Sequence, residues 1–476
     1  MYGKILASTK TNIQGGAILM DIIHQVMEII TREYADNLER LMQGEARISD
    51  MATNLESTLR DVGTKLTGAA LGRLDEAILK SQERKLEWHV ERRRDEKTIA
   101  TVLGEVSYRR TYYRHKRRKE YAYLSDEWAG IEGHARMDDS LRVKLAENAV
   151  EESYQKAVER ESHSGIQSKS AVMNAIRRIG EVEAKLDLKE KRQVEIVYIE
   201  ADEDHVALQN GGNILAKVIY VHEGKTEVNR GRQELRNVRY ISGAAESSED
   251  LWLKVADYLE AAYDTKVIRK VFISGDGHGW IREGLNWIDK SVFVLDRFHL
   301  AKYIRKATAH MEYTRESLWG YVERGMSRAV GDLLDILANE AERGHKQQEV
   351  REAKRYIFNH WEAIQRQKSR EYVGCSAEGH VSHVLSARCS SRPMGWSVMG
   401  LDLMVKMRAF QFNGGNLYDF VRAQKKNQEK DKRIQRMDQR VLRQARKASD
   451  ETLGNLAAVN FGKRTGTMIL LKAYRS

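Results

Sequence analysis

Apolar residues near the start of the chain recur at the spacing of a helix. Ile22, Val26 and Ile30 follow one another at four-residue intervals, and charged residues predominate between residues 75 and 96. This periodicity is typical of helices that bury one face and expose the other. We therefore predict a helical region over residues 1–97.

Residues 98–123 have a different pattern, which is rich in β-branched and aromatic side chains. Such a composition favours strands, and we predict a basic β-hairpin over residues 98–125 that turns near residues 115–119. Residues 107–120 contain seven Lys or Arg and one acid, together with tyrosines. Basic groups neutralise phosphates and aromatic rings stack on bases. The segment is therefore either a nucleic-acid contact or a solvated strand face above packed tyrosines.

Residues 126–190 return to a helical pattern, interrupted by a turn at Gly165. Ser168 stands where an N-cap is expected for the next helix. That helix has four apolar residues on one face, Val172, Ala175, Ile176 and Ile179. A helix, a turn with glycine and a capped basic helix are typical of a DNA-binding helix-turn-helix, but a purely structural helical hairpin has the same outline.

From residue 193, apolar strands alternate with helical segments. Strands are predicted over residues 194–202, 214–224, 268–277 and 292–296, and helices over residues 247–264 and 280–289. This alternation favours an α/β sheet with parallel members. Residues 300–367 are helical in pattern and rich in charge. We therefore predict an α/β core in two parts, residues 191–300 and 371–420, separated by a helical insertion over residues 301–370.

Composition narrows the class of protein and of partner. The 476 residues have a net charge of +11, which favours a polyanion such as nucleic acid. Two cysteines, Cys375 and Cys389, exclude a disulfide scaffold and fit a cytoplasmic protein. Asp21 and His24 interrupt the N-terminal apolar stretch, so we expect neither a signal peptide nor a membrane span.

Basic residues are also concentrated near the C-terminus. Residues 421–447 contain eleven Lys or Arg against three acids, with only a thin apolar stripe. We predict a basic tail over residues 421–476 that contacts phosphates, with a solvated helix face as the alternative. The residues expected to contact DNA are Arg109, Arg110, Arg114, Lys116, Arg117, Arg118, Lys169, Asn174, Arg177, Arg178, Arg388, Arg392, Lys425, Lys426, Arg433, Arg436 and Arg440.

Two acids follow predicted strands and a third begins a predicted helix. Asp202 and Asp276 stand at strand ends, where open α/β sheets bind ligands, and Glu378 lies near the start of an apolar helical run. A single aspartate at a strand end is more often a turn or cap residue. Three carboxylates brought together need a shared cation, and Mg²⁺ or Mn²⁺ takes oxygen ligands. The sequence therefore predicts a site for two such ions, which can act on a phosphodiester.

Five stretches of the sequence carry a resemblance to a known family. They are TVLGEVSYRRTYYR, the EAD of residues 200–202, GDGHGWI from residue 275, LDRFHL from residue 295 and AEGHVSHVLSARCSSRPMGWS from residue 377. Through them, residues 97–417 resemble the ISLre family of bacterial insertion-sequence transposases, which is related to Mutator-type transposases. The resemblance implies an RNase H-like catalytic core with a DDE triad, here Asp202, Asp276 and Glu378.

Residues around the triad also acquire expected roles. Asp296 and His299 are similar to the Asp/Cys-x-x-His element that Mutator-type enzymes carry after the second acid. His278 is expected to orient a water or a phosphate, and His380 to approach the substrate or pack beside the site. Further acids adjoin Asp202 and compete with it for the first position of the triad: Glu200, Glu203 and Asp204.

We therefore expect a DNA transposase that cleaves and transfers DNA strands with Mg²⁺ or Mn²⁺. Its partners would be the terminal repeats of its element, target DNA and further copies of itself on DNA, in the cytoplasm and at the nucleoid. Two alternatives stay open: a non-catalytic DNA-binding protein of a decayed element, and another RNase H-like nuclease. Transfer of a strand to a second duplex distinguishes a transposase from such a nuclease.

Overall fold

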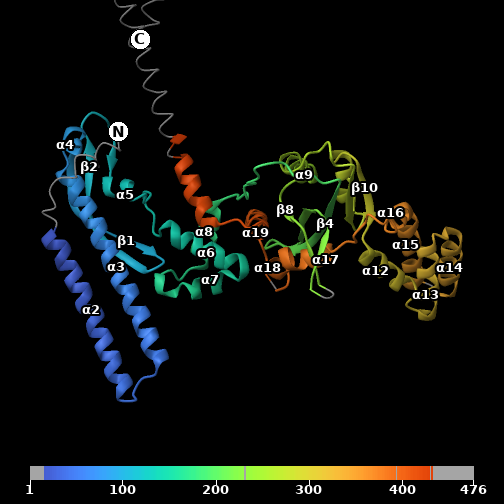
Figure 1. The fold of residues 1–476 in the computed structure, drawn as a ribbon, viewed down its shortest axis with the longest axis horizontal. Coiled ribbons are helices and arrows are strands. Elements are labelled where there is room, and N and C mark those ends of the chain that lie inside the picture. Colours follow the sequence, from blue (N-terminus) through green and yellow to red (C-terminus); the bar gives the residue numbers. More distant parts are fainter. Residues whose placement is uncertain (1–15, 230–231, 343, 393, 429, 432–476) are drawn as a thin grey trace, which may run out of the picture. The chain divides into compact units, whose positions relative to one another are not determined.

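The computed structural model describes residues 16–229, 232–342, 344–392, 394–428, 430 and 431 (Figure 1). The chain divides into two compact units, residues 1–415 and residues 416–476. In the described part of the second unit, residues 417–428 are helical. Most of the predicted basic tail lies outside the described residues, including three of the expected DNA contacts, Arg433, Arg436 and Arg440. No helix of the described part is long and apolar enough to cross a membrane.

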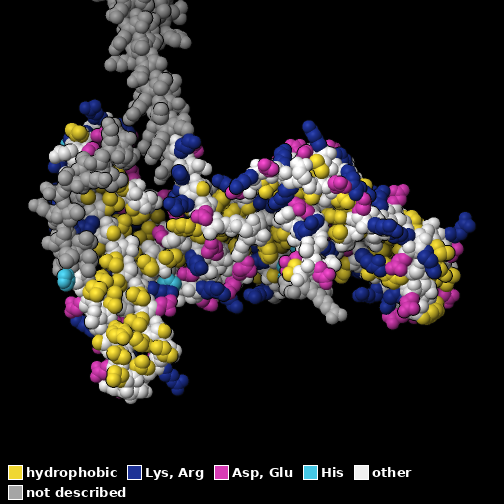
Figure 2. Space-filling model, viewed as in Figure 1, with side chains coloured by type: hydrophobic (Ala, Val, Ile, Leu, Met, Phe, Trp, Pro, Cys, Tyr) yellow, Lys and Arg dark blue, Asp and Glu magenta, His cyan; other side chains and the backbone are white. Residues whose placement is uncertain are grey.

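The predicted N-terminal helices are α2 (Gly16–Met42), α3 (Ile48–Lys80) and the short α4 (Gln82–Glu87). Helices α2 and α3 pack on one another, and Asn54 donates a hydrogen bond to the side-chain oxygen of Asn37 at 2.7 Å. Apolar side chains nevertheless remain exposed on both helices, and Figure 2 shows a hydrophobic face over them. They are Met27, Tyr34, Leu38, Met42, Ile48, Leu59 and Leu66.

The basic hairpin begins ten residues earlier than predicted. Strands β1 (Trp88–Thr101) and β2 (Gly104–His115) are antiparallel, and β3 (Tyr121–Ala122) pairs with the end of β2, followed by α5 (Leu124–Trp128). The predicted turn near residues 115–119 joins β2 to β3, and the turn between β1 and β2 was missed. The outer half of β1 is charged, largely exposed and bulged, and Arg94 has a positive φ of 62°. It therefore lacks the alternation that marks a half-buried strand.

The predicted helical hairpin consists of α6 (Asp139–Glu151), α7 (Tyr154–Arg160) and α8 (Lys169–Ile179). The Ser168 hydroxyl accepts a hydrogen bond from the N–H of Ser170, so the predicted N-cap is confirmed. Gly165 adopts a φ of 80° in the turn before it. The four apolar residues expected on one face of α8 are all buried. Helix α8 thus packs through its predicted face, against α6, α7 and α19.

The core contains a mixed five-stranded sheet in the order β10-β9-β4-β5-β8. Its strands are β4 (Ile196–Ala207), β5 (Asn213–His222), β8 (Arg239–Gly243), β9 (Lys270–Gly275) and β10 (Ser291–Leu295). Strands β4, β9 and β10 are parallel, as predicted, whereas β5 runs antiparallel to both β4 and β8. The sequence did not predict β8, nor the separate ribbon of β6 (Lys225–Asn229) and β7 (Arg232–Leu235).

Alternation along β4 directs successive side chains to opposite faces of the sheet. Val197 and Ile199 belong to the main core, which is covered by α9 (Ser248–Ala262), α10 (Gly279–Arg282) and α11 (Gly284–Trp287). Tyr198 and Glu200 instead bond to the segment that follows the insertion. Side chains two positions apart share a face of a strand, so Asp202 belongs with this second set.

The predicted insertion is a helical bundle of α12 (Arg297–Ala307), α13 (Arg315–Arg324), α14 (Ser327–Glu340), α15 (His345–Asn359) and α16 (Trp361–Arg366). Both ends of the insertion are attached to β10. Figure 1 shows the helices of the insertion beyond that side of the sheet. The Asp296 carboxylate caps α12 by accepting from the N–H of Phe298 at 3.1 Å. At the other end, Arg366 and Gln367 donate to main-chain oxygens of β10 at 3.0 and 2.7 Å.

After the insertion the chain forms α17 (Ala377–Val381), a π-helical turn over Ser382–Ser386, α18 (Ala387–Cys389) and the buried helix α19 (Val398–Phe412). The π-helical turn leaves carbonyl groups that a regular helix would use. The buried guanidinium of Arg408 on α19 donates to two of them, those of His383 and Val384, and also to Val150 of α6. Helix α19 therefore joins the α17 segment to the helical hairpin.

Candidate active site

Three elements position the predicted triad. Asp202 lies on β4, Asp276 directly follows β9, and Glu378 is the second residue of α17, near a helix start as predicted. Strands β4 and β9 are parallel neighbours, with Glu200 opposite Ser274, so both aspartates reach the same edge of the sheet. The backbone of α17 packs on β4. The three carboxylates thus come together from positions 176 residues apart at most, since 378 − 202 = 176.

The electrostatics of Asp202 report this convergence. Burial is the largest cause that raises the pKa of Asp202, and the negative charges of Asp276, Glu203 and Glu378 add to it. The N–H of Glu203 donates to the carboxylate and lowers the pKa, and the net result is a pKa of about 7. Asp202 is only 6% exposed. A buried carboxylate among other carboxylates keeps its proton or takes a cation, because the ionised form is costly there.

Two groups of side chains could each hold a metal ion. In the first, ligand atoms of Asp202, His299 and Glu378 all lie within 4.8 Å of one another. The Nε2 atom of His299 is buried and has no hydrogen-bond partner among the described residues. A buried nitrogen without a partner is rare and costly, so a ligand at this place would satisfy it. The resemblance assigned His299 to the surroundings of the site, and the structure brings it into contact range of two of the acids.

The second group consists of Glu203, Asp276 and His278. The Nδ1 atom of His278 contacts Glu203 and lies 3.2 Å from an oxygen of Asp276, and its main-chain N–H donates to Asp276 at 2.9 Å. Burial lowers the pKa of His278, but the charges of Asp276 and Glu203 outweigh this, and the net shift is upward. The two carboxylates therefore favour the protonated form of His278 when no metal ion is bound.

The loop that carries Asp276 is fixed on both sides. A side chain at Gly275 would lie 2.6 Å from the main-chain oxygen of Ala201, so β9 approaches β4 too closely for any other residue. Gly277 has a φ of 93°, and a side chain there would lie 2.4 Å from Nε2 of His360 in the insertion. The ring of His360 therefore occupies the space beside Gly277. A side chain at Gly279 would meet no described atom within 4 Å, so the loop stays open at this position.

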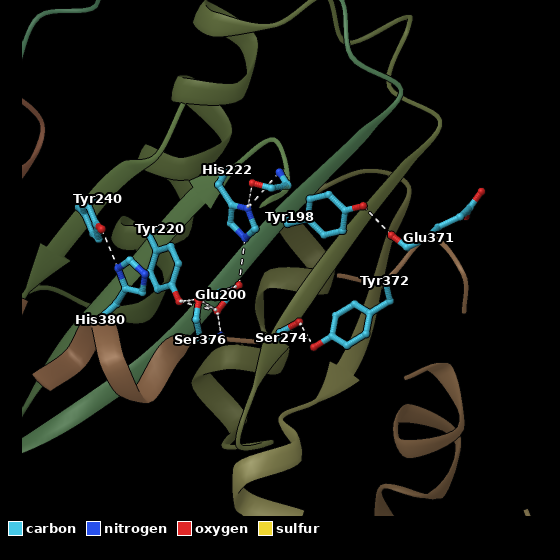
Figure 3. A network of polar contacts seen from close by, with 11 residues as sticks. Tyr198, Glu200, Tyr220, His222, Tyr240, Ser274, Glu371, Tyr372, Ser376 and His380 are labelled. Atoms are coloured by element: carbon cyan, nitrogen blue, oxygen red, sulfur yellow. Dashed lines mark hydrogen bonds and ion pairs between the residues drawn. The ribbon is translucent and has the colours of Figure 1, made fainter. Parts of the chain in front are cut away.

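The acids that competed with Asp202 have other partners. Glu200 is buried in a network with Tyr220, His222 and Ser376, which Figure 3 shows. Burial raises the pKa of Glu200, but hydrogen bonds from His222 and the charge of that ring lower it more, to about 2. Asp204 accepts a hydrogen bond from the Ser390 hydroxyl at 2.6 Å.

Two residues that were expected to support the site have structural partners. Asp296 is buried as the cap of α12, and burial raises its pKa, with Glu200 and Glu378 adding to the rise. The Nδ1 atom of His380 lies 2.6 Å from the hydroxyl of Tyr240, and its ring lies 4.4 Å from the ring of Tyr220. Burial lowers the pKa of His380, so the ring is neutral. His380 therefore packs beside the site, which is one of the two roles considered for it.

The expected DNA contacts divide into exposed and engaged side chains. Exposed members on the hairpin form cross-strand or local ion pairs, such as Arg109 with Glu96 at 3.2 Å and Arg114 with Glu91 at 3.6 Å. Arg118 pairs with Glu120, Lys116 donates to a main-chain oxygen of α4, and Arg178 contacts Glu132. The remaining exposed members are Arg117, Lys169, Asn174, Arg177, Arg392 and Lys426, while Lys425 is half-buried.

Two of the expected DNA contacts are wrong. Arg110 is largely buried, contacts Asp126 and lies 3.5 Å above the ring of Tyr123. Arg388 is 5% exposed, donates to the main-chain oxygen of Ala149 at 2.7 Å and lies over Trp396. Burial lowers the pKa of Arg388. Both guanidinium groups hold the fold together and do not face a phosphate.

Sequence reasoning missed two contributors to the site. Glu203 was considered only as a substitute for Asp202, yet its carboxylate joins Asp276 and accepts a hydrogen bond from Trp280 Nε1 at 2.6 Å. Tyr356 of α15 donates to the main-chain oxygen of Asp276. The GDGHGW stretch placed Trp280 near the site, but no sequence signal linked position 356 to position 276.

Comparison with known proteins shows relatives along nearly the whole chain. A family model described as "Uncharacterised protein family (UPF0236)" matches residues 41–427. A UPF0236 protein of Caldanaerobacter subterraneus subsp. tengcongensis is 41% identical over 461 residues, 96% of this chain and 98% of the relative. Its name lists eleven loci of that genome.

Another UPF0236 protein from the same organism is 39% identical over 480 residues, 99% of this chain and 97% of the relative. A UPF0236 protein named for a vanSb 3′ region of Streptococcus gallolyticus is 24% identical over 390 residues, 79% of this chain and 85% of the relative.

Proposed function

This chain belongs to the uncharacterised protein family UPF0236, and we propose that it is a metal-dependent DNA transposase of an insertion sequence. The observation that carries the proposal is the convergence of Asp202, Asp276 and Glu378 at one edge of the sheet, where each of the other two raises the pKa of Asp202. A relative encoded at eleven loci of one genome supports an element that multiplies within its host.

The topology supports an RNase H-like core. Its sheet has the first strand of the core, β4, at the centre, an antiparallel hairpin partner β5 on one side and the parallel strands β9 and β10 on the other. In such a sheet the ends of the central parallel strands lie side by side, and ligand sites form there. The helical insertion then lies between the second and third acids along the chain.

The donor atoms fit Mg²⁺ or Mn²⁺, and we propose one ion at each of the two groups. Asp202 and Glu378 offer carboxylate oxygens and His299 a free nitrogen in one, and Asp276 and Glu203 offer oxygens in the other. When bound, the ions would stabilise the charge that develops on the attacking and leaving oxygens of the phosphodiester.

The protein's own groups would do the remaining work. Tyr356 and Gly277 fix the loop of Asp276, and His278 holds a proton between two carboxylates until the substrate arrives. The exposed basic residues of the β1–β2 hairpin and of α8 would hold the DNA through its phosphates, whose contacts set register and affinity. The exposed apolar face of α2 and α3 would join copies of the chain on DNA.

The proposal is tested with the purified full-length protein, a labelled duplex of the DNA that flanks its gene, Mg²⁺ and a target plasmid. We expect cleaved ends and joined products. Asp202→Asn, Asp276→Asn and Glu378→Gln should each abolish both products and leave DNA binding intact, because affinity comes mostly from Lys and Arg. Cleavage without joining would indicate a nuclease, and sequence-specific binding without cleavage a DNA-binding protein of a decayed element.

A further inference from the structure

We propose that Glu200 is a positioning residue that sets the place of Glu378, an inference that rests on the proposed function. Glu200 and Asp202 lie two residues apart on β4 and share the face of the sheet that α17 covers. Asp202 belongs to one of the two groups of potential metal ligands, whereas Glu200, two positions earlier on the strand, is 1% exposed. Glu200 has no place in either group of potential metal ligands among the described residues.

The Glu200 carboxylate binds the residue from which α17 begins. Its oxygen Oε2 accepts hydrogen bonds from the N–H of Ser376 and, at 3.2 Å, from the Ser376 hydroxyl. Ser376 is the N-terminal flanking residue of α17, and Glu378 is two residues further along. Helix α17 runs without a break into the π-helical turn and α18, so Ser376 flanks the start of a helical segment over residues 377–389. The bonds from Ser376 to Glu200 tie that start to the sheet.

Strand β5 orients the carboxylate from the opposite side. Tyr220 is the direct cross-strand neighbour of Glu200 and donates its hydroxyl to Oε2, while His222 Nε2 lies 3.0 Å from Oε1. The N–H of Gly224 donates to Nδ1 of His222 at 3.1 Å, which leaves Nε2 as the ring atom that donates to Glu200. Figure 3 shows these groups converging on the one carboxylate.

The chemistry of the partners explains why a carboxylate stands at this position. Tyr220, His222 and the N–H and hydroxyl of Ser376 all act as donors towards it. An ionised carboxylate has only acceptors, and it can satisfy all of them. A glutamine side chain has the same shape, but its NH₂ group would replace one of the two oxygens and would face donor groups. The bond to Ser376 or the bond to His222 would then be lost, and the start of α17 would move.

A neighbouring contact provides a matched control. Tyr198 lies on the same strand and the same face, and its hydroxyl donates to the main-chain oxygen of Glu371 at 2.5 Å. It therefore ties β4 to the same segment, five residues before Ser376 (376 − 371 = 5). If Glu200 only stabilised the sheet, losing either contact would lower stability alone. If Glu200 positions Glu378, only its loss will change the metal requirement.

The experiment compares Glu200→Gln, Ser376→Ala and Tyr220→Phe with Tyr198→Phe in the full-length protein. Three quantities are measured: Mn²⁺ binding to the DNA-free protein by electron paramagnetic resonance, the rate and Mg²⁺ requirement of cleavage, and DNA affinity. Glu200→Gln should weaken Mn²⁺ binding about 10-fold, as loss of a residue that orients a ligand does, and lower the cleavage rate about 100-fold. Tyr198→Phe should leave both unchanged, and no variant should change DNA affinity.

Folded Glu200→Gln protein with wild-type Mn²⁺ binding and cleavage would overturn the inference. If Glu200→Gln fails to fold, the variants Ser376→Ala and Tyr220→Phe test the inference instead, because each deletes a single hydroxyl. The inference then requires that both weaken Mn²⁺ binding more than Tyr198→Phe does. The proposed function fails separately, if the wild type neither cleaves nor joins DNA. In that case the Mn²⁺ measurements still decide whether Glu200 positions the site, and a wild type that binds no Mn²⁺ overturns both.

Discussion

The hydroxyl of Tyr356 donates a hydrogen bond to the main-chain oxygen of Asp276, 2.6 Å away. Tyr356 lies on α15 of the helical insertion, and its ring stacks on Tyr303 of α12 with ring centres 3.8 Å apart. Burial, together with the charge of Asp276, raises the pKa of Tyr356, so the hydroxyl remains a donor. The insertion is therefore part of the support of the site, although its helices lie beyond the sheet.

Tyr356→Phe tests this support. Removing the hydroxyl frees the loop of Asp276 while the ring still stacks on Tyr303, so we expect a cleavage rate about 10-fold lower with little change in the melting temperature. Tyr313→Phe is the control, because Tyr313 lies in the same insertion and is 78% exposed. Equal rates for the two variants would show that the loop is held by its backbone alone.

The stability of the metal-free protein should depend on the ionisation of Asp202. Its pKa is raised to about 7 in the fold, from an ordinary value of 3.8, so folding favours the protonated form. This contribution is complete below pH 4 and is lost as the pH rises towards 7. Between pH 5 and pH 8 the wild type should lose about 2 kcal/mol more than Asp202→Asn.

Chemical denaturation of both proteins in chelator measures the difference. Mg²⁺ at pH 8 should restore the wild type and leave Asp202→Asn unaffected, because the cation replaces the proton at the carboxylate. Parallel pH profiles for the two proteins would show that Asp202 is already ionised in the metal-free fold.

The second acidic group predicts the behaviour of His278. Glu203→Gln keeps an acceptor for Trp280 but removes a charge that raises the pKa of His278. We expect the pKa of the imidazole to fall, and NMR titration measures the change. Asp204→Asn is the matched control, because Asp204 is adjacent in sequence but bonds to Ser390. A His278 that titrates alike in both variants would mean that Asp276 alone sets its protonation.

Two arginines of one segment should behave in opposite ways. Arg388→Ala should destabilise the protein by about 3 kcal/mol, because it leaves the Ala149 carbonyl without its buried donor. Arg392→Ala should leave stability unchanged, since Arg392 is exposed. If Arg392 contacts a phosphate, its loss should make the slope of log affinity against log salt shallower by about 0.9. If the Arg388→Ala protein is folded and its DNA affinity is changed, the purely structural role of Arg388 would be contradicted.

The basic tail makes a separate prediction from charge alone. Deleting residues 421–476 removes a net charge of +8 within residues 421–447. If this charge makes four phosphate contacts, the salt slope of DNA binding should become shallower by roughly 3.6. Fluorescence anisotropy at several salt concentrations measures the slope. An unchanged slope would assign the tail to a protein contact or to solvent.

The local pattern of apolar residues was sufficient to predict the helices and strands that are buried on one face or on both. Strands β4, β9 and β10 and the apolar face of α8 followed from their apolar residues, because these residues are buried. The outer half of β1 could not be predicted in this way, because both of its faces are exposed. Strands β6, β7 and β8 have five residues at most, which is too short for a period to show.

For the candidate site, the sequence located the acids at the strand ends but not the residues that contact them. Alternation assigns Glu200, Asp202 and Asp204 to one face of β4, and it cannot tell which of them meets Ser376, which meets Glu378 and which meets Ser390. Those partners lie more than 170 residues away. The burial of Arg388 was hidden for the same reason, since its acceptor is 239 residues distant.

The attachment of the insertion to a single strand has a practical consequence. Because the insertion leaves and rejoins the sheet at β10, the polypeptide can be divided between α14 and α15 into two fragments. The first would contain Asp202 and Asp276 and the second Glu378, so neither would contain the whole candidate site. The apolar contacts between α14 and α15, among them Leu334 and Ala353, would bring the fragments back together. Under the proposed function, two separately controlled genes would make DNA mobility conditional on the expression of both.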